Sequence, residues 1–210
     1  MLPPSSFQSC IDRLRGHFRS VEIARPATEE ELTWLRQTFR SVPEQVERFY
    51  SLCSGIKVTL EDEAAGELMT LAKSLCGLPM WDGYDDPEQY LPITWDGCGN
   101  EGCLVLRPGF GEGAVVFLDH EAGGGPAYLL AGSIQGFLTM WTDSLIYSYD
   151  AEGNLDPKCK PIELDRWPWL ERSERDHPWP FDLEWMQAHD PSAALLIQDA
   201  RFAEWIPEDR

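Results

Sequence analysis

Three glycines in the segment WDGCGNEGCLVL have the spacing of a phosphate-binding loop. Gly97, Gly99 and Gly102 fit the pattern G-x-G-x-x-G, in which backbone amides at the start of a helix hold a dinucleotide pyrophosphate. That chemistry needs a strand before the glycines and a helix after them. The residues that follow, CLVL and then AVVFL, have the composition of strands. We therefore expect a turn or bulge between antiparallel strands, and no bound nucleotide.

A histidine between two acids is the second arrangement that could do chemistry. His120 lies between Asp119 and Glu121 after the run AVVFL, and these residue types could serve as a general acid or base with flanking carboxylates. Neighbours in a strand point to opposite faces, however, so the two acids would share one face and the histidine would occupy the other. We expect His120 to cap a turn at the end of a strand.

The cysteines offer the third possible chemistry, a metal site. Cys98 and Cys103 lie five residues apart with His120 further along, whereas a zinc site usually has four ligands and close cysteine pairs. The six cysteines form no C-x-x-C pair, and no P-loop, nucleophile elbow or H-E-x-x-H motif is present. We expect free thiols, no metal, no cofactor and no catalytic set, and hence a protein that is not an enzyme.

Much of this chain is expected to be helical. Apolar residues at helical spacing predict a helix over 6–18, and Thr28 with Glu31 forms a capping box that opens a second helix. A third helix is expected to have Pro43 in its first turn and to stop at Gly55. A short strand, IKVTL, and a helix over 64–76 should follow, and a further apolar helix should begin at Ser133.

The middle of the chain has the two-residue period of strands. Strands are predicted over 91–95, 103–106, 114–118 and 127–130, separated by turns rich in glycine and proline. The fold class expected is α+β, with a mostly antiparallel sheet of about 4–6 strands packed with N-terminal and closing helices.

The charge of the chain is strongly negative and unevenly distributed. The net charge is −19, and residues 61–121 carry 13 acids and 2 bases, a net of −11. Such a surface repels nucleic acid and anionic membranes, so we expect neither as a partner. It suits either a solvated acidic face or a basic protein partner. The start, MLPPSSFQSC, lacks the pattern of a signal peptide, so a cytoplasmic location is expected.

Several segments, taken in order, resemble one known family. They are ATEEEL, VPEQVERFYSLCSG, LPI, DGCGNEG, CLVL, AVVFLDHE and SIQGFL, and together they are similar to the SMI1/KNR4 family of the SUKH superfamily over residues 28–141. Val42 replaces the usual leucine before Pro43, Ser54 replaces a common asparagine, and Ile134 takes an aromatic position. We expect an SMI1/KNR4-like domain over 1–149, and an extension over 150–210, outside the resemblance, that packs on the same domain.

The resemblance also implies a function. Many bacterial members neutralise a cognate toxin by binding it, so we expect a non-catalytic immunity protein of an interbacterial or polymorphic toxin system. Fungal members act as regulators, and a regulatory or scaffold protein that binds an endogenous partner is the alternative. The acidic middle of this chain suits a basic toxin domain, because complementary charge speeds association and sharpens partner choice. The oligomeric state stays open.

The loop PMWDGYDDPEQY is the candidate partner-binding segment. Aromatic residues are typical interface anchors, but Trp81 and Tyr84 could equally pack on the core while the acids are solvated. Acids on the turns beside the sheet complete the candidate site. Its members are Trp81, Asp82, Tyr84, Asp85, Asp86, Asp96, Glu101 and Glu112.

The C-terminal region holds five of the nine tryptophans, and prolines interrupt the run DRWPWLERSERDHPWPFDLEW. Tryptophans in this number are expected to be covered rather than free in water. We favour packing on the main domain over direct partner contacts. A terminal helix is predicted over 191–205, begun by Asp190.

Overall fold

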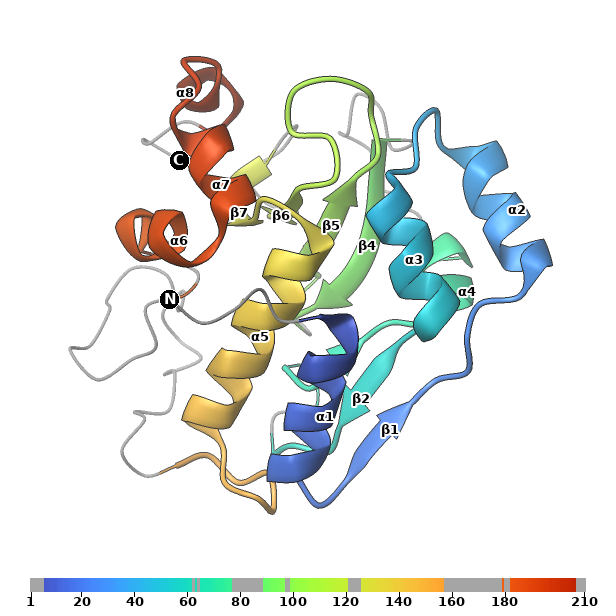
Figure 1. The fold of residues 1–210 in the computed structure, drawn as a ribbon, viewed down its shortest axis with the longest axis vertical. Helices are drawn as coiled ribbons and strands as arrows, with labels where there is room; N and C mark the ends of the chain where they lie inside the picture. The colour runs from blue at the N-terminus through green and yellow to red at the C-terminus, as the bar shows by residue number, and fades with distance from the viewer. Residues whose placement is uncertain are drawn as a thin grey trace.

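Two antiparallel sheets with helices packed against them form the fold (Figure 1). The computed structural model describes residues 6–76 apart from 62 and 64, and residues 89–96, 99–120, 126–156, 179 and 182–206. The α+β class predicted from the sequence is confirmed. The strands of the described part divide into a three-stranded and a four-stranded sheet, rather than forming a single sheet.

The N-terminal part contributes three helices and the smaller sheet. Helix α1 (Phe7–His17) is followed by β1 (Val21–Ile23), α2 (Glu29–Thr38), α3 (Glu44–Leu52), β2 (Ile56–Val58) and β3 (Glu67–Leu68). The predicted capping box of α2 is present: the Glu31 amide donates to the Thr28 hydroxyl at 3.2 Å, and the Thr28 amide donates to the Glu31 carboxylate at 2.6 Å. Two donors at the start of α2 are thereby satisfied.

Two predictions for this region are wrong. The helix expected over 64–76 is a strand, β3, followed by a shorter helix, α4 (Leu71–Cys76). Pairing with β2 overrides the helical pattern, and Gly66 permits it because a Cβ there would lie 2.2 Å from the Val58 carbonyl oxygen. Helix α3 ends at Leu52 rather than at Gly55, where a Cβ would lie 2.7 Å from the Leu68 carbonyl oxygen.

The larger sheet is a meander of four strands in sequence order. Its members are β4 (Tyr90–Trp95), β5 (Glu101–Val105), β6 (Val115–Leu118) and β7 (Pro126–Ala131). All four predicted strands are confirmed, with ends that differ by at most two residues. A strand, not a helix, follows the glycine pattern. Gly102 lies within β5, and Gly99 has a φ of 104°, which favours glycine.

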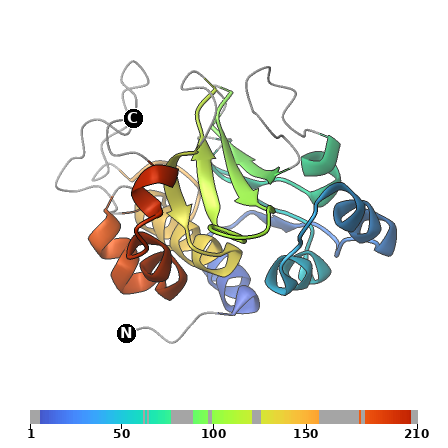
Figure 2. The same cartoon turned by 90° about the horizontal axis from the view of Figure 1, so that it is seen from above.

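Helix α5 (Ile134–Ser148) crosses the centre of the molecule. It begins at Ser133, as predicted, where the hydroxyl accepts a hydrogen bond from the Gly136 amide at 3.0 Å. Helices α1, α3 and α5 lie on one side of the sheets (Figures 1 and 2). Helix α5 also contacts the connection between β2 and β3 of the smaller sheet, where the Trp141 indole donates a hydrogen bond to the Ala65 carbonyl at 3.1 Å. The core therefore runs between α5 and both sheets.

The described C-terminal part forms the helices α6 (Leu183–His189), α7 (Pro191–Ile197) and α8 (Phe202–Trp205). Helices α6 and α7 lie beside β7 and α5 (Figure 1), whereas Trp205 of α8 contacts the Phe110 ring in the β5–β6 loop, with 5.4 Å between the ring centres. Asp190, which is 2% exposed, accepts hydrogen bonds from the Gly132 amide at 2.8 Å and the Ser192 amide at 2.9 Å. The helix predicted over 191–205 starts at Asp190 but is two helices. A local turn intervenes, because the Asp199 carboxylate accepts from the Arg201 amide at 2.9 Å.

Candidate functional site

Asp96, the first described member of the predicted site, holds a turn together. It follows β4, and its carboxylate accepts hydrogen bonds from the backbone amide of Asn100 at 3.1 Å and from the Asn100 side chain at 2.6 Å. The buried Asn100 oxygen in turn accepts from the His120 amide at 3.1 Å and lies 2.7 Å from His120 Nδ1. His120 thus joins the end of β6 to the β4–β5 turn, in agreement with the structural role predicted for it.

Glu101 lies within the sheet rather than on a turn. It is the first residue of β5 and pairs with Trp95 of β4 and Leu118 of β6. Burial raises the pKa of its carboxyl from 4.5 to about 7, so at neutral pH it carries only part of a charge. Burial also raises the pKa of the Cys103 thiol, whose sulfur lies 4.0 Å from the Glu101 carboxylate. Cys103 therefore lacks the thiolate character of a nucleophile.

Glu112 connects two loops. It lies between β5 and β6, and its carboxylate accepts hydrogen bonds from the Ser41 hydroxyl and from the Gly109 amide, the latter at 3.4 Å. Ser41 belongs to the connection between α2 and α3. The Glu112 carboxylate consequently stabilises the contact between the sheet and the helices.

The remaining members of the predicted site lie outside the described residues. They are Trp81, Asp82, Tyr84, Asp85 and Asp86. Their contribution to partner binding stays a prediction. The described part brings Asp96 and Glu101 to the same end of the larger sheet, at the β4–β5 turn. Glu112 lies on the loop that joins β5 to β6.

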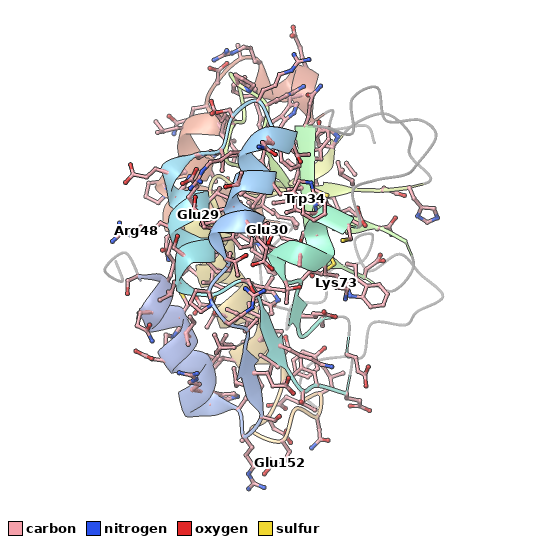
Figure 3. All side chains as sticks on the ribbon, turned by 90° about the vertical axis from the view of Figure 1, so that its right-hand side faces the viewer. Glu29, Glu30, Trp34, Arg48, Lys73 and Glu152 are labelled. Atoms are coloured by element: carbon pink, nitrogen blue, oxygen red, sulfur yellow. The ribbon has the colours of Figure 1, made fainter. Side chains whose placement is uncertain are left out.

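The outer face of α2 is a surface that the sequence reasoning did not select. A shallow groove of about 470 Å³ is lined by Glu29, Glu30, Thr33, Trp34 and Gln37. Trp34 is 42% exposed, and Figure 3 shows it with Glu29 and Glu30 on the side of α2 that faces away from the core. Helical spacing could have predicted this exposure, because a helix that buries Leu32 and Leu35 turns the side chain of Trp34 toward the opposite face.

A second exposed tryptophan lies beside a cation. Trp95 is 40% exposed, and the Lys73 ammonium lies 5.6 Å from the centre of its ring. Lys73 also forms an ion pair with Glu67 at 2.8 Å. The Lys73 ammonium therefore interacts with both a carboxylate and an aromatic ring of the same chain.

Two kinds of feature are absent from the described residues, a metal-binding cluster and a membrane-spanning helix. Within them, no group of three or more histidine, cysteine, aspartate or glutamate side chains is placed to hold a metal ion. No helix in the described ranges combines the length and apolar character needed to cross a bilayer. Exposed aromatic rings such as that of Trp34 are typical of surfaces that bind other proteins.

Comparison with known proteins identifies the family. The family description SMI1/KNR4 (SUKH-1) matches residues 26–140, which is more than half of the 210-residue chain. The match begins just before α2 and extends into α5, so it includes both β2–β3 and the whole larger sheet. A comparison with curated proteins gives no match. The chain belongs to the SMI1/KNR4 family (SUKH-1).

Proposed function

We propose that this chain is a non-catalytic immunity protein that binds and neutralises a cognate bacterial toxin in the cytoplasm. Membership of the SMI1/KNR4 family is the observation that carries the proposal. The protein would act stoichiometrically, by covering or distorting the toxin's active site. A basic toxin domain fits best, because residues 61–121 carry a net charge of −11.

The proposed contacts combine aromatic anchors with carboxylates. Trp81, Asp82, Tyr84, Asp85 and Asp86 would supply most of the binding energy, since aromatic side chains at the centre of an interface contribute most. Asp96, Glu101 and Glu112 would border them. Because the carboxylates of Asp96 and Glu112 also accept hydrogen bonds within the chain, we propose that they contribute chiefly by their electrostatic field.

Protection from a toxin is the decisive experiment. The tagged chain would be recovered from its native cells, and the retained proteins identified after washes at low and at high salt. The main captured protein would then be expressed alone and together with the chain. We expect growth arrest by the captured protein alone, growth in co-expression, and capture that weakens at high salt.

A harmless partner would overturn this proposal. A captured protein that leaves growth unchanged would favour the alternative, a regulatory or scaffold protein of the SMI1/KNR4 type that binds an endogenous partner. Protection that persists with amounts of the chain far below those of the toxin would point instead to turnover, and hence to an enzyme. Both results would contradict a stoichiometric immunity protein.

A further inference from the structure

One stripe of α2 faces solvent along its whole length. Glu30, Thr33, Trp34 and Gln37 are exposed and follow the spacing i, i+3, i+4, i+7, which places them on one side of a helix. Leu32 and Leu35 are buried on the opposite side. These four exposed residues, called here the α2 stripe, line the groove of about 470 Å³ together with Glu29 (Figure 3).

Trp34 makes this stripe unlike an ordinary solvated helix face. Its side chain is large and apolar, and exposed tryptophan is enriched at the centre of protein interfaces. Among the described residues its indole N–H has no hydrogen-bond partner, while its carbonyl accepts from the Thr38 hydroxyl at 2.9 Å. The ring therefore offers both a face and a donor to a partner.

Arg25 and Arg36, two cations near the carboxylates of α2, are paired with other acids, whereas Glu30 is paired with no described residue. Arg25 forms two hydrogen bonds with Glu31, both of 2.8 Å, and Arg36 binds Glu29 at 2.8 Å and Glu47 at 2.9 Å. Glu30 forms no ion pair with any described residue. The partial positive charge at the helix N-terminus, about half an elementary charge, offsets only part of this carboxylate. A negative charge thus remains beside the Trp34 ring.

Two other places in this molecule show that a carboxylate and an aromatic ring together can hold a cation. Lys73 lies between the Glu67 carboxylate, at 2.8 Å, and the Trp95 ring, at 5.6 Å from its centre.

Arg201 lies in the same way between a carboxylate and a ring. It is 2.7 Å from the Asp199 carboxylate and 4.5 Å from the centre of the Phe110 ring. Each site, this one and the Lys73 site, has a carboxylate, an aromatic face and a cation. Glu30 and Trp34, one helical turn apart, supply the first two, and in the part of the chain that the structure describes no cation occupies the third place.

We propose that the α2 stripe is a docking site for a basic segment of a protein partner. A lysine or arginine of the partner would lie over the Trp34 ring and pair with the Glu30 carboxylate. Thr33 and Gln37 would form hydrogen bonds to the partner's backbone. The inference rests on the proposed function in one respect, namely that the partner is a protein. It specifies the chemistry of the segment that this partner presents.

Heteronuclear NMR of the isotope-labelled full chain tests the inference without the partner. The probe is a decapeptide of alternating arginine and glycine, and the comparison peptide replaces arginine with glutamate. The indole signal of Trp34 is assigned by its loss in Trp34→Phe. We expect the arginine peptide to shift this indole signal and the amides of the α2 stripe, with shifts that decrease at high salt.

Two isosteric variants separate the site from general attraction to an acidic protein. Glu30→Gln removes the carboxylate of the stripe, and should raise the dissociation constant of the arginine peptide about threefold to fivefold. Glu44→Gln is the matched control, because Glu44 is an exposed acid in the first turn of α3. This control removes the same charge outside the α2 stripe, and should leave both the dissociation constant measured at the Trp34 indole and the shift of that signal nearly unchanged.

Several results would overturn the inference. They are the absence of shifts along the stripe, equal losses in Glu30→Gln and Glu44→Gln, or similar shifts with the glutamate peptide. Shifts that follow protein concentration without peptide would assign the face to a second copy of the chain. A captured toxin that binds Trp34→Ala and the unmodified chain equally would overturn the α2 site alone. A harmless captured partner would overturn only the immunity function.

Discussion

The carboxylates at the larger sheet and the Glu30 carboxylate on α2 differ in what they contact. Asp96 accepts hydrogen bonds from Asn100 of its own turn, and Glu112 accepts from Ser41 of the α2–α3 connection. Burial raises the pKa of Glu101 to about 7. Glu30 faces solvent beside the exposed Trp34. Residues with the same formal charge therefore have different roles. Substitutions near the sheet should lower stability, and substitutions on the α2 stripe should lower affinity for a partner.

The largest expected effect is at Asn100, the centre of the sheet-end network. Asn100→Ala removes the hydrogen bonds to Asp96 and His120 and leaves their polar groups partly unpaired. Loss of buried hydrogen bonds of this kind should lower the free energy of unfolding by about 2–3 kcal/mol. Urea unfolding measures the change, with Gln37→Ala on the exposed α2 face as the control. A loss below that of the control would show that the network is dispensable.

The next effect concerns the pH dependence of stability through Glu101. Its pKa is about 7 in the folded chain against an ordinary 4.5, so between these pH values the folded state binds more protons than the unfolded state. The free energy of unfolding should therefore fall as the pH rises through this window. Glu101→Gln cannot ionise and should remove that fall.

Unfolding in urea at several pH values tests this sign. Allowing for partial exposure of the carboxyl, Glu101→Gln should be more stable than the unmodified chain by about 1–2 kcal/mol at pH 8 and equally stable at pH 4. A variant that is less stable at pH 8 would mean that the ionised carboxylate has a favourable partner. Glu101 would then resemble Asp96 and Glu112 rather than differ from them.

A smaller effect is expected at the start of α2. Thr28→Ala removes the hydroxyl that accepts from the Glu31 amide, and should cost about 1 kcal/mol of stability. Thr28→Ser keeps the acceptor and serves as the control. If the two variants unfold at the same urea concentration, the cap does not hold α2 in place, and the α2 stripe would be less rigid than the sheet end.

The sequence predicted well the features that depend on neighbours along the chain. The α2 capping box needs only Thr28 and Glu31, and the four strands of the meander follow from alternation between glycine-rich turns. The sequence did not predict the strands that form only by pairing with residues distant along the chain. The short β3 strand forms because it pairs with β2, and the three residues of β1 are too few to show a period.

The candidate site shows the same limit more sharply. Nothing near Glu112 in sequence reveals that its carboxylate binds Ser41, which lies 71 residues away. Likewise, the sequence near Glu101 does not reveal that this residue pairs with two strands or that burial raises the pKa of its carboxyl. The sequence shows which residues are acidic, but it does not show which hydrogen bonds their carboxylates accept or how deeply they are buried. The exposed position of Trp34 was readable, because it follows from helical spacing alone.

The most direct test of the difference between the two regions is a paired measurement on Glu30→Gln. Its free energy of unfolding and its affinity for the arginine–glycine decapeptide are compared with those of the unmodified chain. We expect a stability change within about 0.5 kcal/mol and a dissociation constant raised about threefold to fivefold. A clear loss of stability with unchanged peptide affinity would contradict this expectation, because Glu30 would then be structural, like the acids at the sheet.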